Sequence, residues 1–241
     1  MSLDGEPTRP IHEAAATESS PRTLTYADIT PTEVTPEVYE QTRNRLNAMG
    51  WQIIRTDSMS LRQLAKAGKL LNHAHGSDND ELLDYVPPIL EVAIDSREPT
   101  FKAVNQPLAA QITQLDQLLH DINHPIWLNE GEELDQEEIV EGVKASLLPG
   151  AVVTQLAEAY RVKTRKPLLA DVVKTETEDG VLRDENPFAV SCIDSPDGIF
   201  RLAMRQESLR STWLVATLWD SRVKTPPVRT LRALILPTPK K

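Results

Sequence analysis

The chain has 241 residues, which is enough for one large domain or two small ones with a sizeable core. Hydrophobic residues make up 40% of the sequence and aromatic residues only 5%, so the core must rest on Leu, Ile, Val and Ala. The nine glycines lie far apart, which excludes the close glycine spacing of a Rossmann fingerprint, a Walker A loop or a Gly-x-Ser-x-Gly elbow.

The net charge of −10 is distributed unevenly along the chain. Residues 161–241 contain 15 Lys and Arg against 10 Asp and Glu, whereas residues 1–160 contain 11 against 26. This division is compatible with self-association, or with an anionic partner for the basic part alone. No apolar run approaches the roughly 20 residues of a membrane span, and no leader peptide is recognisable, so we expect a soluble, cytoplasmic protein without a membrane partner.

The first part of the chain combines a polar arm with a capped helix. Residues 1–34 are rich in Pro, Thr, Ser and Glu, and we expect a disordered arm there. A helix is predicted to follow Thr35, which suits the N-cap, with Pro36 at its first position and Gly50 at its end. Residues 51–54 indicate a short strand.

The next elements alternate between helix and strand. A second helix is predicted from Ser60, where Gln63 completes a capping box, through Gly68 to Leu71. Residues 90–95 alternate between apolar and mostly polar positions and predict a strand that joins the C-terminal sheet.

The longest predicted helix begins at Asn105 and carries a leucine-rich seam. This seam is suited to packing within the chain, and a dimer contact is the alternative. Its members are Leu108, Ile112, Leu115, Leu119 and Ile122. A further helix is predicted from Asp135 to the Pro149–Gly150 break, and another over 151–160.

The last quarter of the chain predicts an antiparallel sheet after a polar loop over 174–186. The strands are expected at 188–193, 199–206, 212–219 and 228–236, with 212–219 in a central position. The single cysteine, Cys192, is interpreted as a small buried residue. We therefore predict an α+β fold in which helices pack on an antiparallel sheet formed mainly by the C-terminal third. Residues 35–175 would be mainly helical, with one or two short strands, and 176–241 would form the antiparallel β region, both within one globular domain.

Two pairs of histidines are candidate ligands for a divalent metal. His73, His75 and Asp78 are similar to the His-x-His-x-Asp-His run of metallo-hydrolases, but the aspartate is one position late and no histidine follows. His120 and His124 have the spacing that places two imidazoles on one helix face. The favoured interpretation is that the first pair ends a helix and that Asp78 or Asn79 caps the next one.

Charged residues form two further groups. The acidic run from Glu130 to Glu141 is interpreted as a solvated helix start rather than a cation site. The basic residues are interpreted as solvated strand faces, and nucleic-acid contact is the alternative. They are Arg161, Lys163, Arg165, Lys166, Arg201 and Arg205.

These observations favour a non-enzymatic binding or structural protein that acts through protein-protein contacts, with a protein partner or a second copy of itself. The first alternative is a nucleic-acid-associated protein that uses the basic C-terminal half. The second is a metal-dependent hydrolase, and a divalent metal is the sole cofactor that the sequence suggests.

Overall fold

The computed structural model describes residues 26–72, 83–102, 108–124, 139–165, 168–169, 173–176, 182–185, 189–192, 200–206, 214–220 and 228–240. Helices and antiparallel sheets together form an α+β fold, which confirms that part of the prediction.

A four-stranded antiparallel sheet lies at the centre of the described chain. Its strands, in spatial order, are β2 (Trp51–Arg55), β4 (Glu91–Asp95), β12 (Ala233–Ile235) and β5 (Lys144–Ala145). Ala93 lies opposite Ile53 of one neighbour and Leu234 of the other. Because both faces of β4 and β12 are covered, residues 92–94 and 233–235 are all apolar and buried.

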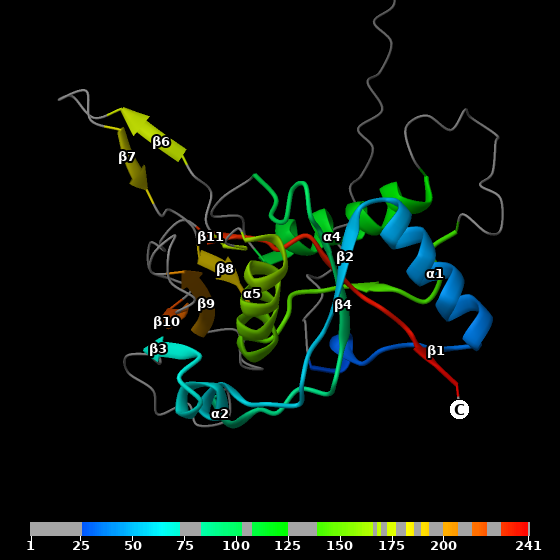
Figure 1. Ribbon diagram of the computed structural model, residues 1–241, viewed down its shortest axis with the longest axis horizontal. Helices are drawn as coiled ribbons and strands as arrows, with labels where there is room; N and C mark the ends of the chain where they lie inside the picture. Colours follow the sequence, from blue (N-terminus) through cyan, green and yellow to red (C-terminus); the bar gives the residue numbers. More distant parts are fainter. Residues whose placement is uncertain are drawn as a thin grey trace, which may run out of the picture.

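Helices cover both faces of this sheet. They are α1 (Pro36–Ala48), α2 (Leu61–Lys66), α4 (Leu108–Asn123) and α5 (Gly150–Thr164). Ile54 and Val92 pack on one face with apolar residues of α2 and α5, whereas Trp51 and Ala93 pack on the other with Leu46 of α1. Figure 1 shows α1 and α5 on opposite sides of β2 and β4. The alternation along each strand thus separates two cores.

A second sheet of five strands contains most of the C-terminal strands. Its order is β11 (Val228–Arg229), β8 (Ala189–Ser191), β9 (Phe200–Gln206), β10 (Leu214–Asp220) and β3 (Leu70–Asn72). The middle pairs are antiparallel and the two outer pairs are parallel. β10 lies between β9 and β3, which confirms the interior position predicted for 212–219.

The antiparallel sheet is not confined to the C-terminal third. Three strands of the central sheet, β2, β4 and β5, come from the earlier part of the chain, and β4 pairs with the late strand β12 as predicted. Two smaller pairs complete the strands. They are β6 (Val173–Glu176) with β7 (Leu182–Glu185), and β1 (Glu33–Val34) with β13 (Thr238–Pro239).

The predicted helix starts are confirmed by side-chain caps. The Thr35 hydroxyl accepts a hydrogen bond from the backbone N–H of Val38, at 3.4 Å, and Pro36 opens α1. Ser60 and Gln63 form the reciprocal capping box of α2. Both caps satisfy backbone donors that a helix leaves unpaired at its start, which explains why local sequence fixed these boundaries.

One predicted helix is shorter than expected, and the described part of another is not helical. α2 ends before Gly68, whose φ of +71° turns the chain, so Leu71 lies in β3 rather than in a helix. No atom of the described residues lies within 4 Å of a Cβ added at Gly68, so none of them requires a glycine there for close approach. Residues 139–149 are not helical either: β5 pairs with β12, and Val143 and Leu147 are buried from irregular backbone.

Two segments predicted to be irregular contain regular structure. The 174–186 loop includes strands β6 and β7, which are held by pairing with each other. Residues 26–34 of the predicted arm form the 3₁₀ helix η1 (Tyr26–Ile29) and β1, and Ile29 is fully buried. Residues 26–34 are ordered by contacts with residues far away in the sequence, and composition does not reveal such contacts. The rest of the predicted arm, residues 1–25, lies outside the described residues.

Candidate binding sites

The α2 helix and the segment 83–89 form one surface that side-chain contacts hold together. The Arg62 guanidinium forms a two-point ion pair with Asp84, at 2.6 and 3.2 Å. The Ser58 hydroxyl donates a hydrogen bond to the Pro87 carbonyl at 2.7 Å. These contacts join the start of α2 to a segment more than twenty residues later.

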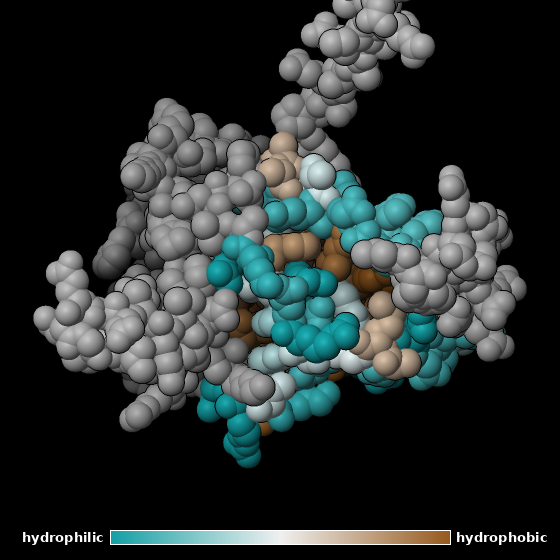
Figure 2. All heavy atoms as spheres, turned by 90° about the horizontal axis from the view of Figure 1, so that it is seen from above, coloured by the Kyte–Doolittle hydropathy of each residue, from teal (hydrophilic) through white to brown (hydrophobic). Residues whose placement is uncertain are grey.

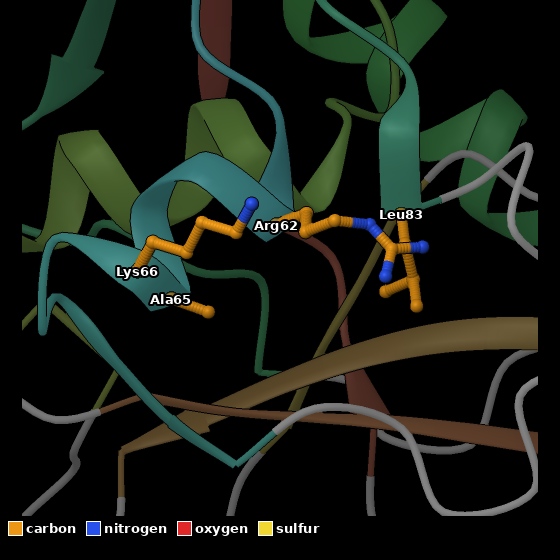
Figure 3. A pocket seen from close by; sticks show the side chains of 4 residues that line it. All are labelled: Arg62, Ala65, Lys66 and Leu83. Atoms are coloured by element: carbon orange, nitrogen blue, oxygen red, sulfur yellow. The ribbon is translucent and has the colours of Figure 1, made fainter.

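A cavity of about 360 Å³ opens on this surface and is lined by Arg62, Ala65, Lys66 and Leu83. In Figure 3 the Arg62 guanidinium reaches toward Leu83, and Lys66 projects from the following turn of the same helix. Lys66 is exposed and has no ion-pair partner among the residues that the structure describes. The cavity therefore combines apolar side chains with positive charge.

Two apolar side chains project from the same segment. Val86 is 46% exposed and Ile89 is 49% exposed, on either side of two prolines that restrict the backbone. Pro87 is buried, and Thr56 exchanges hydrogen bonds with Leu90 at the end of the segment. The backbone that carries Val86 and Ile89 is thus held in place by contacts within the chain.

We call this region the α2 surface, and it consists of Arg62, Ala65, Lys66, Leu83, Val86 and Ile89. Tyr85 lies among these residues, and burial raises the pKa of its hydroxyl. The sequence analysis did not identify this surface. The available signals were two cations four positions apart on a helix and a Val-Pro-Pro-Ile run, in which Val86 and Ile89 are exposed.

A second cavity, of about 340 Å³, lies between α4 and a charged cluster on Arg232. The Arg232 guanidinium contacts Asp95 at 3.1 Å and Glu98 at 2.6 Å, and its central carbon lies 5.5 Å from the ring centre of Phe101. Asp95 is buried and also accepts hydrogen bonds from the backbone N–H groups of Arg97 and Glu98. Two carboxylates already neutralise Arg232, so this cluster is better suited to holding the chain together than to binding an anion.

His120 lies in the last turn of α4, and His124 directly follows the end of that helix. The rings of His120 and His124 stack with 4.4 Å between their centres, and His120 lies 3.5 Å from Asp121. Within the described ranges no three His, Cys, Asp or Glu side chains are grouped closely enough to hold a metal ion. His73, His75 and Asp78 lie outside those ranges, so the metal hypothesis stays a prediction.

The structure brings two parts of the predicted basic cluster onto neighbouring elements. Arg161 and Lys163 lie in the last turn of α5, Arg165 caps that helix in a left-handed conformation, and α5 packs against β9, which contains Arg201 and Arg205. Lys166 lies outside the described residues. Nucleic-acid contact at these residues stays a prediction.

The apolar seam of α4 packs inside the chain. Ile112 and Leu115 belong to the core on the α5 face, and Ile122 belongs to the core on the α1 face, with Leu119 partly buried beside it. Leu108 is the first residue of the helix. Ile112, Leu115 and Ile122 are therefore buried by intrachain contacts, and a dimer contact through this seam stays a prediction.

Comparisons of the chain with protein-family models, with curated proteins and with solved structures find no match. Within the described part of the chain, no helix is both long and apolar enough to cross a membrane.

Proposed function

We propose that this is a non-enzymatic binding protein that acts through protein-protein contacts, with the α2 surface as the docking site. The observation that supports the proposal best is the pair Val86 and Ile89, each about half exposed on a fixed backbone. Interfaces commonly place apolar side chains at the centre and charged ones at the rim. Here Arg62 pairs with Asp84, two positions before Val86, and Lys66 lines the same cavity as Leu83.

Among the residues coloured in Figure 2, hydrophilic side chains predominate, and hydrophobic ones are visible between them. Against such a surface, two half-exposed aliphatic side chains on one short segment are a distinct feature. Burial of the exposed part of Val86 and Ile89 by a partner contributes roughly 1 kcal/mol of binding free energy for each side chain. A fixed backbone preserves this gain, because little conformational entropy is lost on binding.

The experiment replaces the two apolar side chains and follows complexes in cell extract. We expect the double variant V86S/I89S to lose the cross-linked partners that the unmodified chain captures, as quantified by mass spectrometry. The matched control is V162S, because Val162 is 55% exposed on α5, outside the α2 surface. Equal partner profiles for V86S/I89S and the unmodified chain would contradict the proposal.

A further inference from the structure

The α2 surface carries positive charge in a chain that is acidic overall. Residues 58–72 contain Arg62, Lys66 and Lys69 and no Asp or Glu. Arg62 and Lys69 are paired with Asp84 and with Glu158, at 2.6 and 2.9 Å, but Lys66 has no such partner in the described part of the chain. A ligand with negative charge would therefore gain most from contact with Lys66.

The densest run of complementary charge in the sequence is residues 130–138. Six of the nine residues 130–138 are Asp or Glu, none is Lys or Arg, and Leu134 is the single large apolar residue among them. An acidic segment with one leucine matches a cavity that has both cationic and apolar side chains. A leucine side chain is smaller than the cavity of about 360 Å³ beside Lys66.

The residues that flank this acidic segment lie on the opposite face of the central sheet from α2. The Asn123 side chain exchanges hydrogen bonds with the backbone of Val140, at 2.9 and 3.1 Å, and Ile122 and Val140 belong to the α1 face. Leu61 and Leu64 of α2 belong to the other face. Because its two ends are joined, the segment between them can extend about seven residues, roughly 24 Å, before it must return. A route to the α2 surface of the same chain would have to pass around the sheet.

We propose that the α2 surface binds the acidic segment 130–138 of a second copy of this chain. Carboxylates of the segment contact Lys66, and Leu134 enters the cavity beside Ala65 and Leu83. The proposal rests on the protein-binding function given above, and it names the partner. Each copy has one α2 surface and one acidic segment, so a twofold dimer contains two equivalent contacts.

The test uses a fluorescent peptide of residues 130–138 and the full-length chain. We expect a binding isotherm in fluorescence anisotropy at about 0.05 M NaCl that weakens strongly at about 0.5 M, as screening requires. The variant K66E should lower the affinity about tenfold, whereas K163E should change it less than twofold. Lys66 and Lys163 are both exposed helix residues, so both variants should keep the unfolding temperature of the unmodified chain.

A second peptide with all six acids replaced by Gln or Asn separates charge from apolar contact, and it should bind at least tenfold more weakly. Equal binding of the two peptides, equal effects of K66E and K163E, or no binding at low salt would each overturn the proposal. Sedimentation velocity should also show self-association that K66E removes. If the peptide fails while V86S/I89S still loses partners in extract, the binding function stands and the partner is another protein.

Discussion

Arg232 connects two segments that are far apart in the sequence. Its guanidinium bonds Asp95 and Glu98, and its backbone N–H donates to the Pro99 carbonyl at 2.8 Å. Asp95 is 4% exposed, so removal of Arg232 leaves a buried carboxylate with much of its compensation lost. Removing one partner of a buried ion pair lowers the free energy of unfolding strongly, even where the complete pair contributes little to it.

We predict that R232M lowers the free energy of unfolding by about 3 kcal/mol, measured by urea denaturation. The matched control is R97M, because the Arg97 side chain is 73% exposed and lies 3.7 Å from the same carboxylate. Its effect should stay below about 1 kcal/mol. Equal losses for the two variants would show that burial of Asp95 does not determine the cost.

Tyr160 predicts a dependence of stability on pH. Burial, with the negative charge of Asp95 nearby, raises the pKa of its hydroxyl, which donates a hydrogen bond to the Ser96 carbonyl at 3.2 Å. Because the folded state holds this proton more tightly, the resulting stability is present below about pH 10 and is lost as pH rises through the folded pKa.

The variant Y160F should cost about 1 kcal/mol at neutral pH through the lost hydrogen bond. Above about pH 10 its unfolding free energy should fall less steeply than that of the unmodified chain. Urea titrations at several pH values measure both effects. Parallel pH profiles for the two proteins would rule out this role of Tyr160.

At the scale of elements, Gly142 lies where its own segment packs closely against β1 and against Pro237. Its φ is +72°, and an added Cβ would lie 2.7 Å from Cγ1 of Val34 and 3.1 Å from Cβ of Pro237. Val34 belongs to β1, and Pro237 precedes β13, so a side chain at this position would push against the β1–β13 pair. Glycine is required here both by backbone conformation and by space.

We predict that G142A costs about 3 kcal/mol, because conformational strain and steric overlap both contribute. G50A is the control: Gly50 has a φ of +84° but no atom within 4 Å of the added Cβ, so about 1 kcal/mol of strain is expected. Thermal unfolding of both variants measures the difference. A loss for G142A no larger than that for G50A would contradict the steric part of the argument.

Element boundaries with local causes could be predicted from the sequence. The caps at Thr35 and Ser60, the alternation in β4 and the start of α5 after Pro149 all depend on residues within one or two turns. β1 and β5 could not be predicted, because two residues carry no period and distant pairing holds them. The α2 surface could not be predicted for the same reason, because it joins α2 to residues about twenty positions later in the sequence.

At the scale of the whole molecule, the order of strands in the central sheet differs from their order in the chain. β12 lies between β4 and β5, although about ninety residues separate it from β5 in the sequence. Pairings between such distant residues incur a high cost of loop closure before any contact is made. We therefore expect the central sheet to assemble late in folding.

The position of β12 also bears on how the chain is made. A ribosome synthesises the amino end first, at roughly 5–20 residues per second, so β2, β4 and β5 emerge before Ala233–Ile235. Until then the edges of β4 and β5 that later receive β12 have no partner from this sheet. During synthesis the nascent polypeptide would expose these edges, and chaperones that shield unpaired strands would be most valuable to it in that interval.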